Sequence, residues 1–327
     1  MREVAVVTTG FFDGVHLGHR HVIETVVSSA RERGEEAVVV SFWPHPRAVL
    51  QQDARDLRLL STLEEKKAML LSLGIDRVEV LPFIREFAAL TAAQYLDMLR
   101  DRYGATLVIM GYDNRIGSDK KTGRELYSSQ TVCFADPSQS KLWAPPSYVA
   151  EGGHRFGNHT VPVPQILISE EYHPCHSERS EESVSSTVIR RKLSEGDVEG
   201  GNAMLGYEYT LTGAVVAGNR MGRTSGFPTA NMQLYEPLKL VPGNGVYAVE
   251  VEVLGAKWRG MCNIGTRPTV GGASRTIETH ILDFDQDIYG LPLTIRFVRR
   301  IRDERHFPSL EALRQQLMLD REKCLAP

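Results

Sequence analysis

Residues 10–19 read GFFDGVHLGH, and this stretch does the most to decide the fold. A run rich in β-branched residues precedes it over 4–9, and the apolar spacing of a helix follows it over about 18–33. A glycine-bearing turn between a strand and a helix is a good phosphate site, because the helix N-terminus presents unpaired N–H groups and a partial positive charge. There His16 and His19 can donate hydrogen bonds to phosphate oxygens as negative charge develops during a transfer reaction.

Metal ligation and ordinary turn chemistry are the other interpretations of His16 and His19. A metal site needs a third ligand, and no cluster of His or Cys lies near the pair in the sequence.

Strands and helices alternate through the first half of the chain. Two of the helices begin at capping boxes, Thr62 with Glu65 and Thr91 with Gln94. Such alternation predicts a Rossmann-like α/β domain whose parallel sheet binds ligands beyond the carboxyl ends of its strands. The predicted strands are 4–9, 36–42, 76–82 and 106–110, and the predicted helices are about 18–33, 63–73 and 92–102.

Residues 118–184 interrupt this alternation. The segment is rich in Ser, Pro, Gly and Glu, and within it residues 161–168 look like a strand. A loop of this length is unusual in a compact domain, so we expect most of it to be an irregular or mobile insertion.

Short β runs separated by Gly, Pro and Asn turns begin near residue 207 and predict an antiparallel barrel or sandwich. An amphipathic helix over about 309–324 follows, with Leu310, Leu313 and Leu317 on one face. The domain boundary is expected near 190–206, where glycines cluster among charges. The predicted strands are 209–217, 245–254, 258–264, 276–283 and 293–301.

Length and composition favour a two-domain globular protein. The chain has 327 residues, 42% hydrophobic residues and a net charge of −3, so it lacks the basic balance of nucleic-acid or membrane-surface binders. No apolar run approaches the ~20 residues of a membrane span, and no signal peptide opens the sequence. The four cysteines are widely spaced without a CxxC pair, which fits reduced thiols in the cytoplasm.

Three further segments of the first half carry polar side chains at expected strand or helix ends. His45 lies between two prolines after the second strand, and Asp113 lies in a glycine-bounded segment, 111–117, after the fourth. Residues 185–190 place hydroxyls and an arginine at a predicted helix start, which suits a triphosphate. Taken alone, a histidine between prolines is more often a loop residue than a site residue, and segment 111–117 is a weak signal. Residues 185–190 fit an N-cap with surface arginines as well as they fit a phosphate site.

The second half carries a glycine- and arginine-rich segment, 218–231, whose backbone N–H groups and charges suit phosphate. Thr229 and Asn231 alternate along it and point to one side, and neutral oxygens of this kind suit Mg²⁺. Glu278 shares a strand face with His280 and is placed to act as a general base. The plainer interpretations are a hairpin loop and an outward-facing strand residue.

Together the first-half segments resemble the FMN adenylyltransferase module of bacterial bifunctional riboflavin kinase/FAD synthetases, which carries the HxGH signature of nucleotidyltransferases. The resemblance implies a Rossmann-like α/β nucleotidyltransferase domain over 1–192, in which His16 and His19 contact ATP phosphates and FMN attacks the α-phosphorus of ATP. It also implies nucleotide- or flavin-binding roles for Gly10, Phe12, Asp13, Gly18, His45 and Asp113, and phosphate-holding roles for Ser185, Ser186, Thr187 and Arg190.

Residues 205–327 resemble the riboflavin kinase module of the same family. This resemblance implies a six-stranded antiparallel β-barrel with a C-terminal helix, Thr229 and Asn231 as Mg²⁺ ligands, and Glu278 as the base that activates riboflavin for attack on the γ-phosphate of ATP. It further implies that ATP contacts Gly222, Arg223, Gly226 and Pro228.

The chain departs from the family at Ile116, where an aromatic residue is usual, and in the length of 118–184. We therefore hypothesise that the insertion disturbs the flavin-side wall and makes adenylyl transfer weaker than kinase activity, which deletion of 120–180 would test. Two other functions stay open at this point. One is a riboflavin kinase with an impaired or retargeted N-terminal domain, and the other is a catalytically inactive flavin-binding regulator. No feature of the sequence indicates an oligomeric state.

Overall fold

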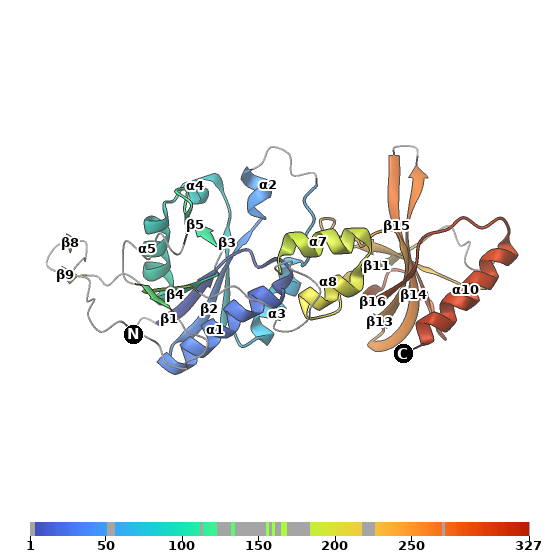
Figure 1. Ribbon diagram of the computed structural model, residues 1–327, viewed down its shortest axis with the longest axis horizontal. Helices are drawn as coiled ribbons and strands as arrows, with labels where there is room; N and C mark the ends of the chain where they lie inside the picture. Colours follow the sequence, from blue (N-terminus) through green and yellow to red (C-terminus); the bar gives the residue numbers. More distant parts are fainter. Residues whose placement is uncertain are drawn as a thin grey trace. The chain divides into compact units, whose positions relative to one another are not determined.

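A computed structural model describes residues 4–50, 56–111, 114–122, 132–134, 155–156, 159–160, 165–168, 184–217, 226–269 and 272–326 (Figure 1). The chain divides into two compact units, which are described separately. Unit 1 comprises Met1–Leu57 and Ser61–Val184, and unit 2 comprises Arg58–Leu60 and Ser185–Pro327.

Unit 1 is built on a six-stranded sheet in the order β3-β2-β1-β4-β10-β7. Each neighbouring pair runs parallel, as the alternation of strands and helices predicts. The chain passes from β1 to β2 on one side and returns to β4 on the other, so the end of β1 lies at a topological switch point, where such sheets bind ligands. The strands are β1 Ala5–Thr9, β2 Glu36–Trp43, β3 Arg77–Pro82, β4 Ala105–Met110, β7 Val132–Phe134 and β10 Gln165–Ile168.

Helices cover both faces of this sheet and create two apolar cores. On one face α1 (Leu17–Arg33) and α3 (Leu63–Ser72) pack against the sheet, and on the other α5 (Ala92–Tyr103) does so. Both predicted capping boxes are present, at the starts of α3 and α5. The shorter helices are α2 Pro46–Leu50 and α4 Arg85–Ala88, and a 3₁₀ turn, η1, covers Asp13–Val15.

Two short strands of the main sheet, β10 and β7, come from the segment 118–184. The strand expected over 161–168 is β10, which pairs with β4, and β7 pairs with β10 in turn. Because β7 has three residues, it offers too little periodicity to be found in the sequence. Two short pairs complete the described elements: β5 Arg115–Ile116 with β6 Lys121–Thr122, and β8 Arg155–Phe156 with β9 His159–Thr160.

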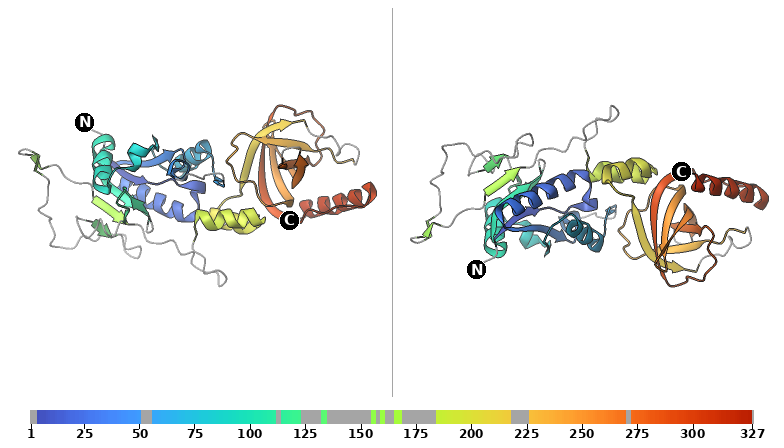
Figure 2. Two further views of the ribbon diagram at one scale, coloured as in Figure 1. Left: turned by 90° about the horizontal axis from the view of Figure 1, so that it is seen from above. Right: turned by 90° about the horizontal axis from the view of Figure 1, so that it is seen from below.

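Unit 2 contains a closed barrel in the order β11-β12-β15-β14-β13-β16, with every neighbouring pair antiparallel (Figure 2). The structure thus decides for a barrel over a sandwich, and it adds β12, which the strand pattern missed. Tyr209, Tyr247 and Phe297 are fully buried in this unit. The strands are β11 Thr210–Val216, β12 Ala230–Leu234, β13 Gly245–Val253, β14 Ala256–Thr269, β15 Gly272–Ile281 and β16 Pro292–Arg302.

The helices described in this unit are α7 Ser186–Glu195, α8 Val198–Leu205 and the C-terminal α10 Leu310–Leu325. Figure 2 shows α10 running beside the barrel wall. Met261 and Leu282 of the barrel and Cys324 of α10 share a small apolar cluster. A distant segment also joins this unit, because Leu59 exchanges backbone hydrogen bonds with Leu238 and Leu240.

Candidate functional site

The turn after β1 places His16 at the N-terminus of α1. Nδ1 of His16 accepts a hydrogen bond from the backbone N–H of His19 at 3.3 Å, so His16 is the N-cap of the helix. The two imidazole rings stack, with centroids 3.6 Å apart and planes inclined by 17°. The structure therefore brings the two predicted histidines together.

The backbone of this turn is held in an unfavourable conformation. Phe12 and Val15 have φ angles of 52° and 39°, in the left-handed region that costs a residue with a Cβ of order 1–3 kcal/mol. Nearby contacts hold it in place: Oδ1 of Asp13 accepts from the backbone N–H and Oγ of Ser61 at 3.1 and 3.3 Å, and the N–H of Gly14 donates to Ser61 Oγ at 3.0 Å. These contacts give buried Asp13 a role in shaping the turn.

Two of the predicted glycines lie against aromatic rings of the same turn. A Cβ on Gly10 would lie 3.1 Å from the Phe12 ring, and a Cβ on Gly18 would lie 3.3 Å from the His16 imidazole. A side chain at either position would need the facing ring to move by a few tenths of an ångström, so glycine allows the close packing seen in this turn.

His45 joins the same site through ring contacts. Its imidazole lies 4.2 Å from the ring of Phe11, centroid to centroid, and its Nδ1 accepts a hydrogen bond from the N–H of Arg47 at 3.0 Å. The Pro-His-Pro segment and the first turn, far apart in the sequence, thus meet at the carboxyl ends of β1 and β2.

Three predicted site residues, Asp113, Gly222 and Arg223, lie outside the described residues.

The predicted phosphate-holding residues of 185–190 form the N-terminal end of α7. Ser185 is the N-cap, and its Oγ accepts from the N–H of Val188 at 3.4 Å. Ser186 and Thr187 lie in the first turn, and Nε of Arg190 donates to the carbonyl of Arg58 at 2.8 Å. By its contacts α7 belongs to unit 2, whereas the histidine pair belongs to unit 1.

In unit 2 the strand pairing brings three polar residues into one row. Two of them are predicted site residues, and the third was not predicted. Glu278 of β15 lies directly between Asn231 of β12 and Asn263 of β14. Residues opposite one another on one face of such strands have Cβ atoms roughly 5 Å apart. Ile277 and Thr279, on either side of Glu278, are buried in the barrel, so the row faces outward.

Two cavities meet at this row, and Thr229 lines both. One, of about 380 Å³, also includes Asn231 and Thr279 and is closed by residues 284–289. The other, of about 810 Å³, has Glu278 and Asn263 on one side. Its apolar side comes from Phe227, Phe307, Leu310, Leu313 and Leu317, so the leucine stripe predicted on the C-terminal helix faces this cavity.

His280 fixes the backbone next to Thr229. Its Nδ1 donates to the carbonyl of Pro228 at 2.7 Å, and its ring meets the Phe227 ring edge to face at 5.1 Å. Burial lowers the pKa of His280 and favours the neutral ring that makes this bond. Pro228 lines the smaller cavity, and Gly226 precedes it with a φ of 80°.

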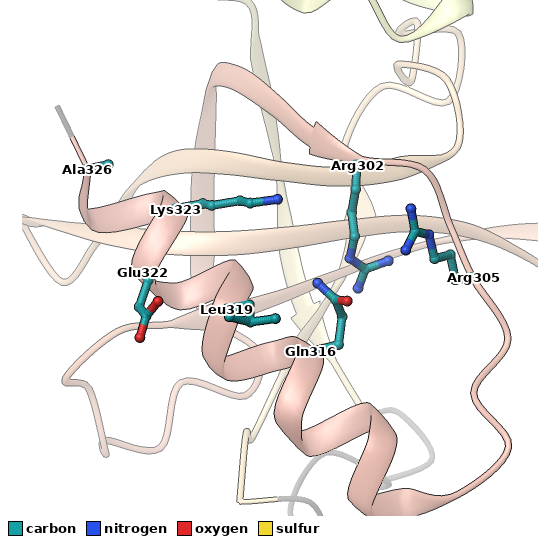
Figure 3. Close-up of a pocket in the computed structure, with 7 residues that line it drawn as sticks. All are labelled: Arg302, Arg305, Gln316, Leu319, Glu322, Lys323 and Ala326. Carbon is teal, nitrogen blue, oxygen red and sulfur yellow. The ribbon is translucent and has the colours of Figure 1, made fainter.

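A buried ion pair anchors α10, which supplies the apolar side of the larger cavity. Asp320 is fully buried and accepts from Nε and Nη2 of Arg302 at 2.9 and 2.8 Å and from Nε2 of Gln316 at 2.8 Å. Figure 3 shows Gln316 of α10 and Arg302 of β16 pointing toward one another. A third cavity, of about 440 Å³, lies beside them between α10 and the Arg302–Arg305 stretch.

Some supporting residues escaped the sequence interpretation. Ser61 and Lys66 reach the first turn from the start of α3, and Nδ2 of Asn114 donates to the carbonyl of Thr9 at 2.8 Å. The capping box that begins α3 was a visible signal, but it does not reveal which distant loop the helix start contacts.

Within the described residues no group of three or more His, Cys, Asp or Glu is arranged to hold a metal ion. Across that same part of the chain, none of the helices has the length and apolar character needed to cross a membrane.

Comparisons with known proteins match both halves of the chain. The FAD synthetase family model matches residues 1–134, and the riboflavin kinase family model matches residues 205–326. The bifunctional riboflavin kinase/FMN adenylyltransferase of Bacillus subtilis is 32% identical over 325 residues, covering 98% of this chain and 92% of that protein. The Escherichia coli protein of the same name is 33% identical over 333 residues, with 98% and 91% covered.

A crystal structure from Streptococcus pneumoniae titled as a macrolide-efflux protein matches with a TM-score of 0.82 and 30% identity. It covers 98% of this chain and 94% of that chain. These alignments cover nearly the whole chain and therefore include residues 118–184.

Proposed function

The chain belongs to the family of bifunctional riboflavin kinase/FMN adenylyltransferases, and from that membership we propose how its residues share the chemistry. The protein phosphorylates riboflavin to FMN with ATP and adenylylates FMN to FAD. Matches to both domains favour this pair of activities over a kinase alone and over an inactive flavin-binding regulator. We assign adenylyl transfer to residues 1–192 and kinase activity to residues 205–327.

The row of Asn231, Glu278 and Asn263 between two cavities is the observation that carries the kinase assignment. The larger cavity has an apolar side for a flat flavin ring and a polar side for its ribityl chain, and the smaller cavity takes ATP. Glu278 accepts the proton of the ribityl 5′-hydroxyl as its oxygen bonds to the γ-phosphorus, and ADP leaves. Thr229 lies where the two cavities meet, beside the transferred phosphoryl group.

The side chains of Thr229 and Asn231 fit Mg²⁺ in this setting. Both are neutral oxygen donors on one edge of the smaller cavity, and Mg²⁺ in kinases is held by few protein ligands together with phosphates and waters. When bound, the ion neutralises charge on the ATP phosphates. The hydrogen bond from His280 to the Pro228 carbonyl holds the backbone that carries Thr229.

For adenylyl transfer, His16 and His19 at the N-terminus of α1 donate to the ATP phosphates. A phosphate oxygen of FMN attacks the α-phosphorus, and pyrophosphate leaves. The chemistry requires positioning and charge neutralisation rather than a covalent nucleophile. Free buried thiols at Cys262 and Cys324 fit the cytoplasmic location that we propose.

Glu278→Gln tests the kinase assignment. We expect FMN formation to fall by about 10²-fold or more, typical for loss of a general base, while riboflavin still binds and quenches its fluorescence. Glu252→Gln, on strand β13 of the same barrel, is the matched control and is expected to keep normal turnover. Normal turnover in Glu278→Gln would exclude this residue as the base.

The product mixture tests the adenylyl assignment. With riboflavin, ATP and Mg²⁺, the wild type is expected to proceed to FAD, and the double variant His16→Ala/His19→Ala to stop at FMN. Its FMN production serves as the internal control for folding. Undiminished FAD formation by the double variant would place adenylyl transfer elsewhere.

A further inference from the structure

A lysine lies buried beneath the phosphate-binding turn of unit 1. Lys66 of α3 is 1% exposed, and its Nζ donates to the carbonyl of Phe11 at 2.7 Å. The same ammonium lies 3.9 Å from the centroid of the Phe11 ring, in cation–π geometry. Lysine is rarely buried to this extent, because removing an ammonium group from water is costly. Its position therefore calls for a function.

Among the residues that the structure describes, one carboxylate acts electrostatically on this ammonium. Buried Asp13 of η1 acts on it through space, and the oxygen atom Oδ1 of Asp13 is already bonded to Ser61. On the strand β2 side the aromatic ring of His45 contacts Phe11. Burial lowers the pKa of Lys66 to about 8, although the negative charge of Asp13 acts in the opposite direction. The ammonium is thus charged at neutral pH and loses its proton within the range of an ordinary assay.

The Lys66 bond acts at a sensitive point of the backbone. The Phe11 carbonyl belongs to the peptide group just before Phe12, the first of the residues with a left-handed φ. The turn then continues through Val15, also left-handed, into the His16 N-cap. A residue keeps such a backbone conformation where several surrounding contacts hold it in place. Lys66 supplies one of those contacts from a separate helix.

We propose that Lys66 is a positioning residue for adenylyl transfer: it fixes the turn that presents His16 and His19, and its positive charge beneath the turn favours binding of the ATP triphosphate. The inference rests on the proposed adenylyl-transfer role of the two histidines. Lys66 acts through the Phe11 carbonyl and through the electrostatic potential at the turn. The positive charge of Lys66 attracts the triphosphate effectively, because water screens a buried ammonium poorly.

Two variants separate its charge from its bulk. Lys66→Met keeps an unbranched side chain of similar length without charge or donor, and we expect the KM for ATP in adenylyl transfer to rise about tenfold or more. Lys66→Arg restores charge and donors and is expected to recover most of that loss. Lys67→Met, at the exposed next position of α3, is the matched control. FMN formation in the same protein reports on folding and is expected to stay unchanged.

The pH profile gives a readout that a merely structural role would not move. Because the ammonium is present below a pKa of about 8, kcat/KM for ATP in the wild type is expected to fall as the pH rises from about 7 to 9. In Lys66→Arg this fall is expected to disappear, because a guanidinium stays charged over the range. This comparison decides the proposal even if Lys66→Met fails to fold.

The proposal is overturned if Lys66→Met keeps the wild-type KM for ATP, or if the wild type and Lys66→Arg share one pH profile. A wrong assignment of the adenylyl-transfer site would give a different experimental result. If His16→Ala/His19→Ala still makes FAD, the adenylyl site itself is misplaced. If that double variant stops at FMN while Lys66→Met behaves as wild type, the role of Lys66 alone is refuted.

Discussion

Replacing Asp320 by asparagine should loosen α10 from the barrel. Asp320 is fully buried, the Arg302 side chain is 9% exposed, and their bonds are 2.8 and 2.9 Å long. The substitution keeps the shape of the side chain but leaves the guanidinium without its counter-charge. Breaking a buried pair in this way costs about 3–5 kcal/mol, because the remaining charge is uncompensated. That is a large share of the ~5–15 kcal/mol by which domains are stable.

The loss should appear both in stability and in one activity. Hydrogen exchange of the α10 amides, followed by mass spectrometry on the full chain, measures the free energy of local opening. Because Leu313 and Leu317 of α10 line the larger cavity, the KM for riboflavin should rise. Adenylyl transfer from supplied FMN should remain unchanged.

An exposed ion pair between the same helix and the turn after β15 provides the matched control. Arg321 and Asp283 are 2.9 Å apart, with side chains 46% and 73% exposed. Asp283→Asn should therefore cost no more than about 1 kcal/mol. If Asp320→Asn costs as little as this control, the reasoning from burial is refuted. The double variant Arg302→Met/Asp320→Leu should recover most of the loss, since it leaves no unpaired charge.

Three other results are expected. Thr229→Val removes one of the two neutral oxygen donors, so the Mg²⁺ concentration that gives half of the maximal kinase rate should rise about tenfold. An unchanged Mg²⁺ requirement would exclude Thr229 as a ligand. Leu313→Asp places a charge on the apolar side of the larger cavity and should raise the KM for riboflavin at least about tenfold, whereas an unaltered KM would place the flavin elsewhere. The proposed disturbance of the flavin-side wall is better tested by deleting 172–181 than 120–180, because the longer deletion removes β7 and β10 from the sheet. The rate of FAD formation should rise in the shorter deletion, and an unchanged rate would contradict the hypothesis.

Much of the architecture was predictable because its signals are local. The capping boxes at Thr62 and Thr91 depend on hydrogen bonds that span three residues, and both helices begin there. The alternation of strands and helices predicted a parallel sheet, and the Gly/Pro-punctuated β runs predicted a barrel or a sandwich, of which the structure has the barrel. β7 and β12 were missed because each is short and lies beside a segment without a clear period.

In the candidate sites, too, some relations between residues follow from local spacing and others depend on the pairing of distant segments. The sequence placed His16 and His19 on one turn and put Thr229 and Asn231 on one strand face, because those relations follow from the spacing of neighbours along a helix start or a strand. It could not place Glu278 between Asn231 and Asn263, because strand register is settled by pairing between distant segments.

By itself, then, the sequence determined which residue types stand at strand ends, helix caps and turns, since interactions within a few residues decide these. The tertiary structure decided which distant groups support them. Lys66 reaches Phe11 across 55 positions, and Ser61 reaches Asp13 across 48. Such contacts form when buried polar groups must find partners away from water, and that requirement is met by the packed fold rather than by any local pattern.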